Sequence, residues 1–171
     1  MTVTTSQRET REQLVREHME SENRHEFDKT LGTFKHPRYE LMNTGEVIDG
    51  SADVARYYEE TRAAFPDQRN ELVAMHHADD AVIVEFDLLG THKGAFRGLP
   101  PTGRSFRCRM VAIFEFEDEG LVCERVYFDS ATILRQLGIA HDPLTLKGRV
   151  ATVLNHPLTI ARGVIRGLAR E

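Results

Sequence analysis

The feature that most constrains the fold is a change of hydrophobic period near Arg69. Before it, apolar and small residues recur at helical spacing, as in the run Val54, Tyr57, Tyr58 and Thr61. After it, apolar and polar residues alternate, which is typical of strands with one buried face. Helices followed by a meander of strands predict an α+β fold, with the helices laid on one face of a strongly curved sheet.

Three helices are expected in the first part of the chain. Ser6 and Glu9 have the spacing of a capping box, so the first helix should begin there. A second helix is predicted over residues 26–33 and a third over residues 51–65, with a short strand at 38–42 between them. The four strand candidates that follow cover residues 70–77, 81–92, 104–116 and 121–129.

Alternation predicts which side chains of these strands face the core. In the second strand candidate the inward row ends at His92, and in the third the inward row leaves Arg107 and Arg109 outward with Val111 and Ile113. The outward row is therefore half apolar. This pattern favours a homodimer in which a second copy covers the outer face of the sheet.

The fourth strand candidate remains ambiguous. One row contains Cys123, Arg125, Tyr127 and Asp129, and the other contains Val122, Glu124, Val126 and Phe128. Apolarity favours burial of the second row. The first row could instead line a cavity, where a phenol and a carboxylate would lie together, or it could face solvent with Arg125 and Asp129 as a weak surface pair.

Composition narrows the classes of function. The 171 residues fit one domain, and the net charge of −5 gives a nucleic-acid partner no overall electrostatic support. No apolar run approaches the roughly 20 residues of a membrane span, and the polar start does not resemble a signal peptide, so we expect a cytoplasmic protein. Cys108 and Cys123 have no metal or redox spacing, and we expect neither a metal nor a cofactor.

The end of the chain differs in charge from the rest. Residues 1–139 hold 17 basic and 25 acidic side chains, a balance of −8, whereas residues 140–171 hold five and two, a balance of +3. We therefore predict a main unit over 1–139 and a basic extension over 140–171. Residues 156–171 are predicted to form an amphipathic helix on which Arg162, Arg166 and Arg170 make one stripe. Packing on the main unit or on a partner subunit is favoured, and contact with a membrane surface is the less favoured alternative.

Two segments resemble a known family. The sequences GTHKGAFRGLPPTGRSF (residues 90–106) and ERVYFDSATILRQLG (residues 124–138) resemble the SnoaL-like polyketide cyclase and ester cyclase group of the nuclear transport factor 2-like superfamily. This resemblance covers about residues 8–139. It implies a cystatin-like cone, in which a curved mixed sheet wraps around a long N-terminal helix, a deep pocket opens at one end, and dimers form through the outer sheet face.

The resemblance also implies an activity. Cyclases of this group close rings by an intramolecular aldol reaction, in which an aspartate removes a proton next to a carbonyl. His92 matches the pocket histidine of the family, but the strand at 104–116 offers no acid before Glu115. Asp129, His92 and Tyr127 are therefore the predicted catalytic residues of a cofactor-independent cyclase, isomerase or hydratase/dehydratase acting on a hydrophobic carbonyl compound. Asp129 could instead be a helix N-cap.

Several further side chains are predicted to line the pocket. These are His18, Asn43, His76, Phe86, Cys108, Met110 and Arg125. For His18 the alternative of a core histidine is favoured, and the adjacent His76 and His77 should point to opposite faces of a strand. The alternative function is a non-catalytic small-molecule-binding or accessory dimerisation protein of the same fold, which a pocket without an inward carboxylate would favour.

Overall fold

The computed structural model describes residues 4–118 and 120–168. In chain order the elements are α1 (Thr5–Asn23), α2 (Phe27–Gly32), β1 (Arg38–Leu41), β2 (Glu46–Asp49), α3 (Ser51–Ala64), β3 (Arg69–His77), β4 (Ala81–Thr91), β5 (Ser105–Glu117), β6 (Gly120–Phe128), α4 (Ser130–Gln136), α5 (Leu146–Asn155) and α6 (Pro157–Leu168).

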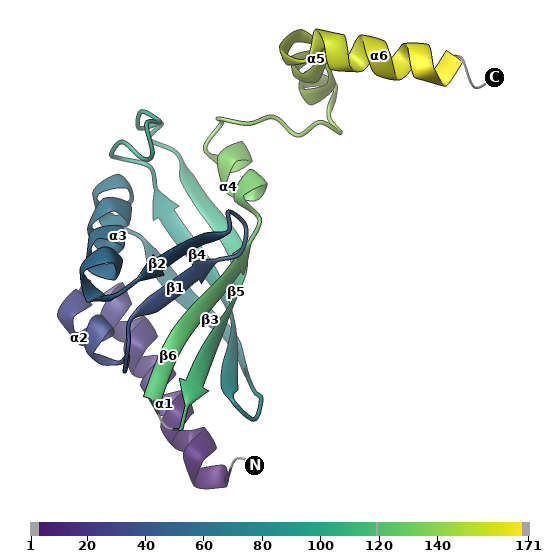
Figure 1. The fold of residues 1–171 in the computed structure, drawn as a ribbon. Coiled ribbons are helices and arrows are strands. Elements are labelled where there is room, and N and C mark those ends of the chain that lie inside the picture. Colours follow the sequence, from purple (N-terminus) through teal and green to yellow (C-terminus); the bar gives the residue numbers. More distant parts are fainter. Residues whose placement is uncertain (1–3, 119, 169–171) are drawn as a thin grey trace.

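The six strands form one curved sheet in the order β2-β1-β6-β5-β4-β3. Among these neighbours β1 and β6 pair in parallel, and the others are antiparallel. The first three helices lie along one side of the sheet, with α1 crossing beneath the strands (Figure 1). The predicted α+β fold with a curved mixed sheet and a long N-terminal helix is confirmed.

The predicted ends of most elements are close to the observed ones, with two corrections. The capping box of α1 is made by Thr4 and Gln7, two residues before the pair we expected at Ser6 and Glu9. The strand β2 was not predicted, because it has only four residues and pairs with β1 alone.

The inner face of the sheet forms the core. The inward rows predicted for β4 and β5 are buried except for the half-buried Leu88, and Ala112 and Val84 at their centre are fully inaccessible. In β6 the apolar row is the inner one, since Val126 pairs with Ala112 and is buried. The main core therefore lies between this face and helices α1 and α3.

The chain leaves the sheet through α4 and ends in two helices that project away from it (Figure 1). The predicted amphipathic helix is present as α6, although its expected last residues, including Arg170, lie outside the described part of the chain. The helix α5 was not predicted. None of the described helices combines the length and the apolar character needed to cross a membrane.

Candidate functional site

A cavity of about 270 Å³ lies between the inner face of the sheet, the end of α3 and the helix α4. Most of its wall is apolar, because strands β1, β5 and β6 each present inward side chains there. Leu41, Met110, Val126 and Phe128 come from these strands, and Ile133, Leu134 and Leu137 close one side at α4. Such a hollow suits a small hydrophobic molecule.

His92 is the most distinctive polar residue of the cavity wall. It is 0% exposed, and its ring stacks on Phe65 with centroids 5.2 Å apart. The backbone N–H of Thr102 donates to Nδ1 at 3.3 Å, so Nδ1 acts as an acceptor and the proton of the neutral ring belongs on Nε2. Nε2 is buried and has no hydrogen-bond partner among the described residues. The buried ring of this wall residue therefore has a hydrogen-bond donor that is not used in the described structure.

The loop after β4 fixes His92 in place. The backbone N–H groups of Lys93 and Gly94 both donate to the carbonyl of Ala64 at the end of α3. This approach requires a glycine, because a Cβ at position 94 would lie 2.1 Å from the carbonyl oxygen of Ala63. The loop is thus attached to α3 within two residues of the histidine.

Asn43 contributes the opposite kind of unpaired group. Its Nδ2 donates to Oγ of Ser130 at 3.2 Å, while its Oδ1 is buried and finds no partner within residues 4–118 and 120–168. Both residues line the cavity. Asn43 was predicted to line the pocket, and its position after β1 brings it to the start of α4. Two residues of the wall, Asn43 and His92, therefore have one buried polar atom each that is unpaired among the described residues.

A second buried polar cluster lies deeper in the core and does not line the cavity. His18 is 0% exposed, and its Nδ1 donates to Thr33 at 2.8 Å because that hydroxyl itself donates to a backbone carbonyl. Its Nε2 lies 3.0 Å from the hydroxyl of Tyr39 and 3.2 Å from Oε2 of Glu124. The Tyr39 hydroxyl also contacts Tyr58 at 2.7 Å. Burial is the main reason that the pKa of Tyr39 is raised well above its usual value.

Glu124 is the buried carboxylate that sequence reasoning did not single out. It is 5% exposed and faces inward beside Tyr39, its register partner on β1. The alternation of the fourth strand candidate did place it in the same row as Val126. The sequence alone did not indicate a function for Glu124, because a single acid among apolar residues forms no recognisable motif.

The structure does not bring Asp129 and Tyr127 to the cavity wall. Asp129 caps α4 by accepting from the backbone N–H of Ala131 at 2.9 Å, and Thr132 also donates to it. The hydrogen bond from Thr132 is the main reason that its pKa is lowered, the opposite of what a base near neutrality needs. Tyr127 is 42% exposed on the outer side. The interpretation of this row as a cavity wall is therefore corrected, because the apolar row of β6 occupies the inner face.

Four other predicted pocket residues also lie elsewhere. Phe86 and Cys108 are core side chains that do not line the cavity. His76 is exposed on β3, and Arg125 lies on the outer face, where it bonds Glu40 at 2.9 Å. Of the predicted site residues, His92, Asn43 and Met110 line the cavity together.

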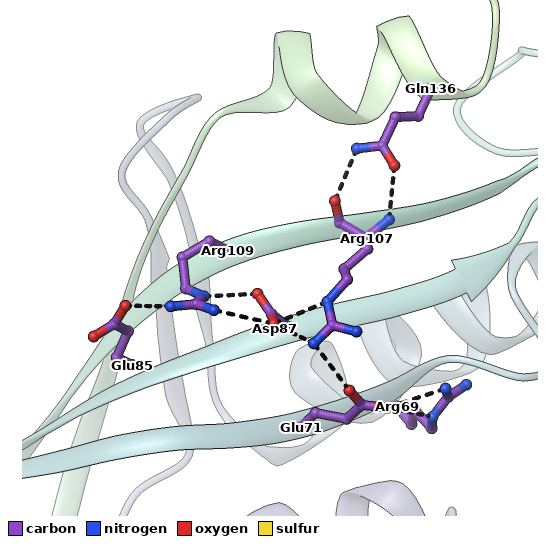
Figure 2. Close-up of polar contacts among 7 residues, drawn as sticks. All are labelled: Arg69, Glu71, Glu85, Asp87, Arg107, Arg109 and Gln136. Atoms are coloured by element: carbon purple, nitrogen blue, oxygen red, sulfur yellow. Dashed lines mark hydrogen bonds and ion pairs between the residues drawn. The ribbon is translucent and has the colours of Figure 1, made fainter.

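The outer face of the sheet carries paired charges (Figure 2). Asp87 of β4 is only 3% exposed and receives hydrogen bonds from Arg107 at 2.6 Å and Arg109 at 2.7 Å, both from β5. The bond from Arg109, followed by that from Arg107, lowers the pKa of Asp87 to about 2. The backbone of Arg107 is in turn held by Gln136, which joins α4 to the sheet (Figure 2).

The cavity wall itself contains no Asp or Glu among the described residues. Arg97 lies at the rim and pairs with Glu46. Tyr57 also lines the cavity, and burial raises the pKa of its phenol, so the hydroxyl stays protonated. Within residues 4–118 and 120–168, no group of three or more His, Cys, Asp or Glu side chains is arranged to hold a metal ion.

Family comparison agrees with this architecture. The family model of the SnoaL-like polyketide cyclase matches residues 12–137, and the chain belongs to that family. The resemblance seen in the sequence is thereby confirmed. No curated protein sequence gives a significant match.

Solved structures show the same fold. IdmH from Streptomyces antibioticus, a proposed polyketide cyclase, is 26% identical with a TM-score of 0.64, covering 75% of this chain and 98% of its own. AclR from Streptomyces galilaeus, a proposed hydroxylase, is 24% identical with a TM-score of 0.67, covering 77% and 87%. A proposed polyketide cyclase from Xanthomonas campestris pv. campestris is 19% identical with a TM-score of 0.69, covering 77% and 98%.

Proposed function

We propose that the protein is a cofactor-independent cyclase that binds a hydrophobic carbonyl compound in the cavity. The observation that carries this proposal is the unpaired Nε2–H of His92 in an apolar, buried setting. An isolated donor there is costly in the free protein and becomes useful when a carbonyl oxygen accepts from it. It stabilises the negative charge that develops on that oxygen during addition to the carbonyl.

The tautomer of His92 suits this role. A neutral imidazole that accepts a backbone hydrogen bond at one nitrogen can polarise a carbonyl with the N–H of the other. In the aldol closure, the enol carbon of the substrate forms a bond to the second carbonyl carbon. The oxygen of that carbonyl becomes the alkoxide beside Nε2 and then takes the proton released by the enol hydroxyl.

The lack of a carboxylate on the described cavity wall limits the substrate. A simple ketone would need a strong base to lose its proton, whereas carbonyls on alternate carbons enolise readily without one. We therefore infer a poly-β-carbonyl substrate, for which oxyanion stabilisation and folding of the chain in an apolar cavity supply most of the acceleration. The association of this family with polyketide chemistry supports that choice.

The test uses the linear tetraketone nonanetetraone, with carbonyls on alternate carbons, as probe. Its ring closure yields an acetyl-substituted dihydroxytoluene and water, which chromatography follows. We expect His92→Phe to lower the turnover number by about 10²- to 10³-fold, the usual effect of losing one oxyanion donor. His92→Gln should retain part of the rate because its amide can donate.

The alternative is a protein that binds the compound without transforming it, and the absence of a carboxylate among the described residues of the wall favours it. The same experiment separates the two. If the wild-type chain binds the tetraketone but does not accelerate its closure, or if His92→Phe closes it as fast, the cyclase proposal fails and the binding function remains.

We also propose that two copies pair through the outer sheet face. Val111 is the register partner of the exposed Tyr127, and Ile113 pairs with Ile83, so apolar side chains cross the centre of this face. Apolar contact across such a patch would stabilise a homodimer.

Tyr127→Glu tests the pairing, because it places a charge at the centre of the proposed interface. Light scattering should show a dimer for the parent chain and a weakening of the dimer by about tenfold or more for the variant. Ala63→Glu on the exposed side of α3 is the control and should leave the mass unchanged. A parent chain that is monomeric at micromolar concentration would overturn the proposal.

A further inference from the structure

The last two helices expose an unusually apolar surface. Nine large apolar side chains of residues 144–168 are between 49% and 80% exposed. The rest of the described chain has fewer exposed large apolar side chains than this short segment. Within the described part of the chain, neither α5 nor α6 packs substantially on the sheet or on α1 to α3, so this apolar surface stays uncovered (Figure 1). We call this pair of helices and the linker before them, residues 140–168, the tail.

The apolar residues of α6 lie on one side. Leu158, Ala161, Ile165 and Leu168 follow each other at intervals of three and four, the spacing of a single helix face, and Val164 borders them. Arg162 and Arg166, four residues apart, form a stripe beside this face. The opposite side carries the small residues Thr159, Gly163 and Gly167.

The tail also has an excess of basic over acidic side chains. No acidic residue occurs between Pro143 and Leu168, whereas Lys147, Arg149 and the two arginines of α6 are basic. Residues 1–139, by contrast, hold 17 basic and 25 acidic side chains, a balance of −8. The tail is therefore the part of the protein that an anionic surface would attract.

We propose that the tail docks the protein on an anionic lipid surface. Its apolar face would enter the boundary between headgroups and acyl chains, and Arg162 and Arg166 at the edge of that face would meet the phosphates. A helix that lies in this boundary needs no membrane-spanning length. The basic charge of the tail and its exposed apolar area together favour an anionic lipid surface over a neutral one.

A second copy of the chain is a poorer match for the tail. The large apolar side chains exposed on the described residues before 139 are few, namely Met42, Val47, Leu72, Val73 and Tyr127. They come from different parts of the sheet, and the proposed dimer already uses Tyr127. These described side chains therefore provide no continuous groove for two amphipathic helices.

The position of the tail gives docking a consequence for the cavity. It follows α4 directly, and Leu137 at the end of α4 and Ile139 just before the tail both line the cavity. Docking would therefore hold the cavity next to a membrane, where a hydrophobic ligand concentrates. This last consequence rests on the proposed function, whereas docking itself does not.

The test is co-sedimentation of the full chain with vesicles, without any ligand. We expect binding to phosphatidylcholine vesicles that contain phosphatidylglycerol, and weak binding to phosphatidylcholine alone. Ile165→Asp should reduce the partition constant by about tenfold or more, since it places a charge in the apolar face. Arg162→Gln and Arg166→Gln should each reduce it by about fivefold on anionic vesicles, and added salt should do the same.

Thr159→Asn is the matched control, because it changes the opposite side of α6 and should leave binding unchanged. Thermal melting of each variant should match the parent, since α6 makes no substantial contact with the described strands of the sheet. The proposal is overturned if the parent chain does not sediment with anionic vesicles, or if it binds neutral vesicles equally well. It is also overturned if Ile165→Asp leaves sedimentation unchanged.

Discussion

Polar side chains are arranged differently on the two sides of the sheet. On the outer face, Asp87 is surrounded by Arg107 and Arg109, and each charge has an opposite charge within hydrogen-bond distance (Figure 2). On the inner side, charges are rare, and the two buried histidines, His18 of α1 and His92 after β4, differ from each other. His18 has a partner at both ring nitrogens, whereas His92 has a partner at one. Complete pairing indicates a structural role, and an unpaired group beside a cavity indicates a site for a ligand.

The largest effect expected from this contrast is on stability. His18→Leu should fill a similar space but remove the imidazole partner of the Thr33 and Tyr39 hydroxyls, beside a Glu124 carboxylate whose Oε2 has no hydrogen-bond partner among the described residues. We expect the free energy of unfolding to fall by about 3 kcal/mol, measured by urea denaturation at constant m-value.

His92→Leu is the matched control, since it also removes a fully buried imidazole. It loses only two long contacts at Nδ1, both with Thr102, and none at Nε2, so the free energy of unfolding should change by less than about 1 kcal/mol. If His18→Leu and His92→Leu destabilise the fold equally, the distinction between a structural and a ligand-binding histidine does not hold.

A smaller effect is expected from the outer face, as a dependence on pH. The pKa of Asp87 is lowered from 3.8 to about 2, so its ion pairs stabilise the folded state fully above the unfolded value. That contribution should disappear as the pH falls from about 4 through about 2. Asp87→Asn should therefore be less stable than the parent at neutral pH, and the difference should shrink across this window.

Acid titrations of unfolding, followed by circular dichroism, measure this difference. Asp53→Asn is a suitable control because its ion pair with Arg56 lies on the exposed side of α3. A gap between parent and Asp87→Asn that stays constant down to pH 2 would show that Asp87 does not act through its ionisation.

The sequence predicted the sheet better than the site. Period-two alternation placed His92 at the inward end of its row, because one face of β4 packs on the core. It could not assign the row of Asp129, since both rows of β6 mix polar and apolar residues, and the capping geometry at the start of α4 decides the matter. The tautomer of His92 depends on Thr102, ten residues away across a loop. No local pattern reveals such a contact.

Two overlapping patterns at the start of the chain show why the ends of helices were harder to place. Thr4 with Gln7 and Ser6 with Glu9 have the same spacing, and both satisfy the capping-box pattern. The structure uses the first pair, so α1 begins at Thr5. Sequence spacing alone does not rank two overlapping signals of equal quality.

Gly94 sets a limit on how this cavity can diversify. Around Gly98 there is open space, so only its backbone angle disfavours other residues, whereas at Gly94 any side chain would collide with the backbone of α3. A substitution there would lift the loop and carry the neighbouring imidazole with it. Selection for new ligands should therefore change the apolar side chains that α4 contributes to the cavity wall before it changes Gly94, which anchors the loop.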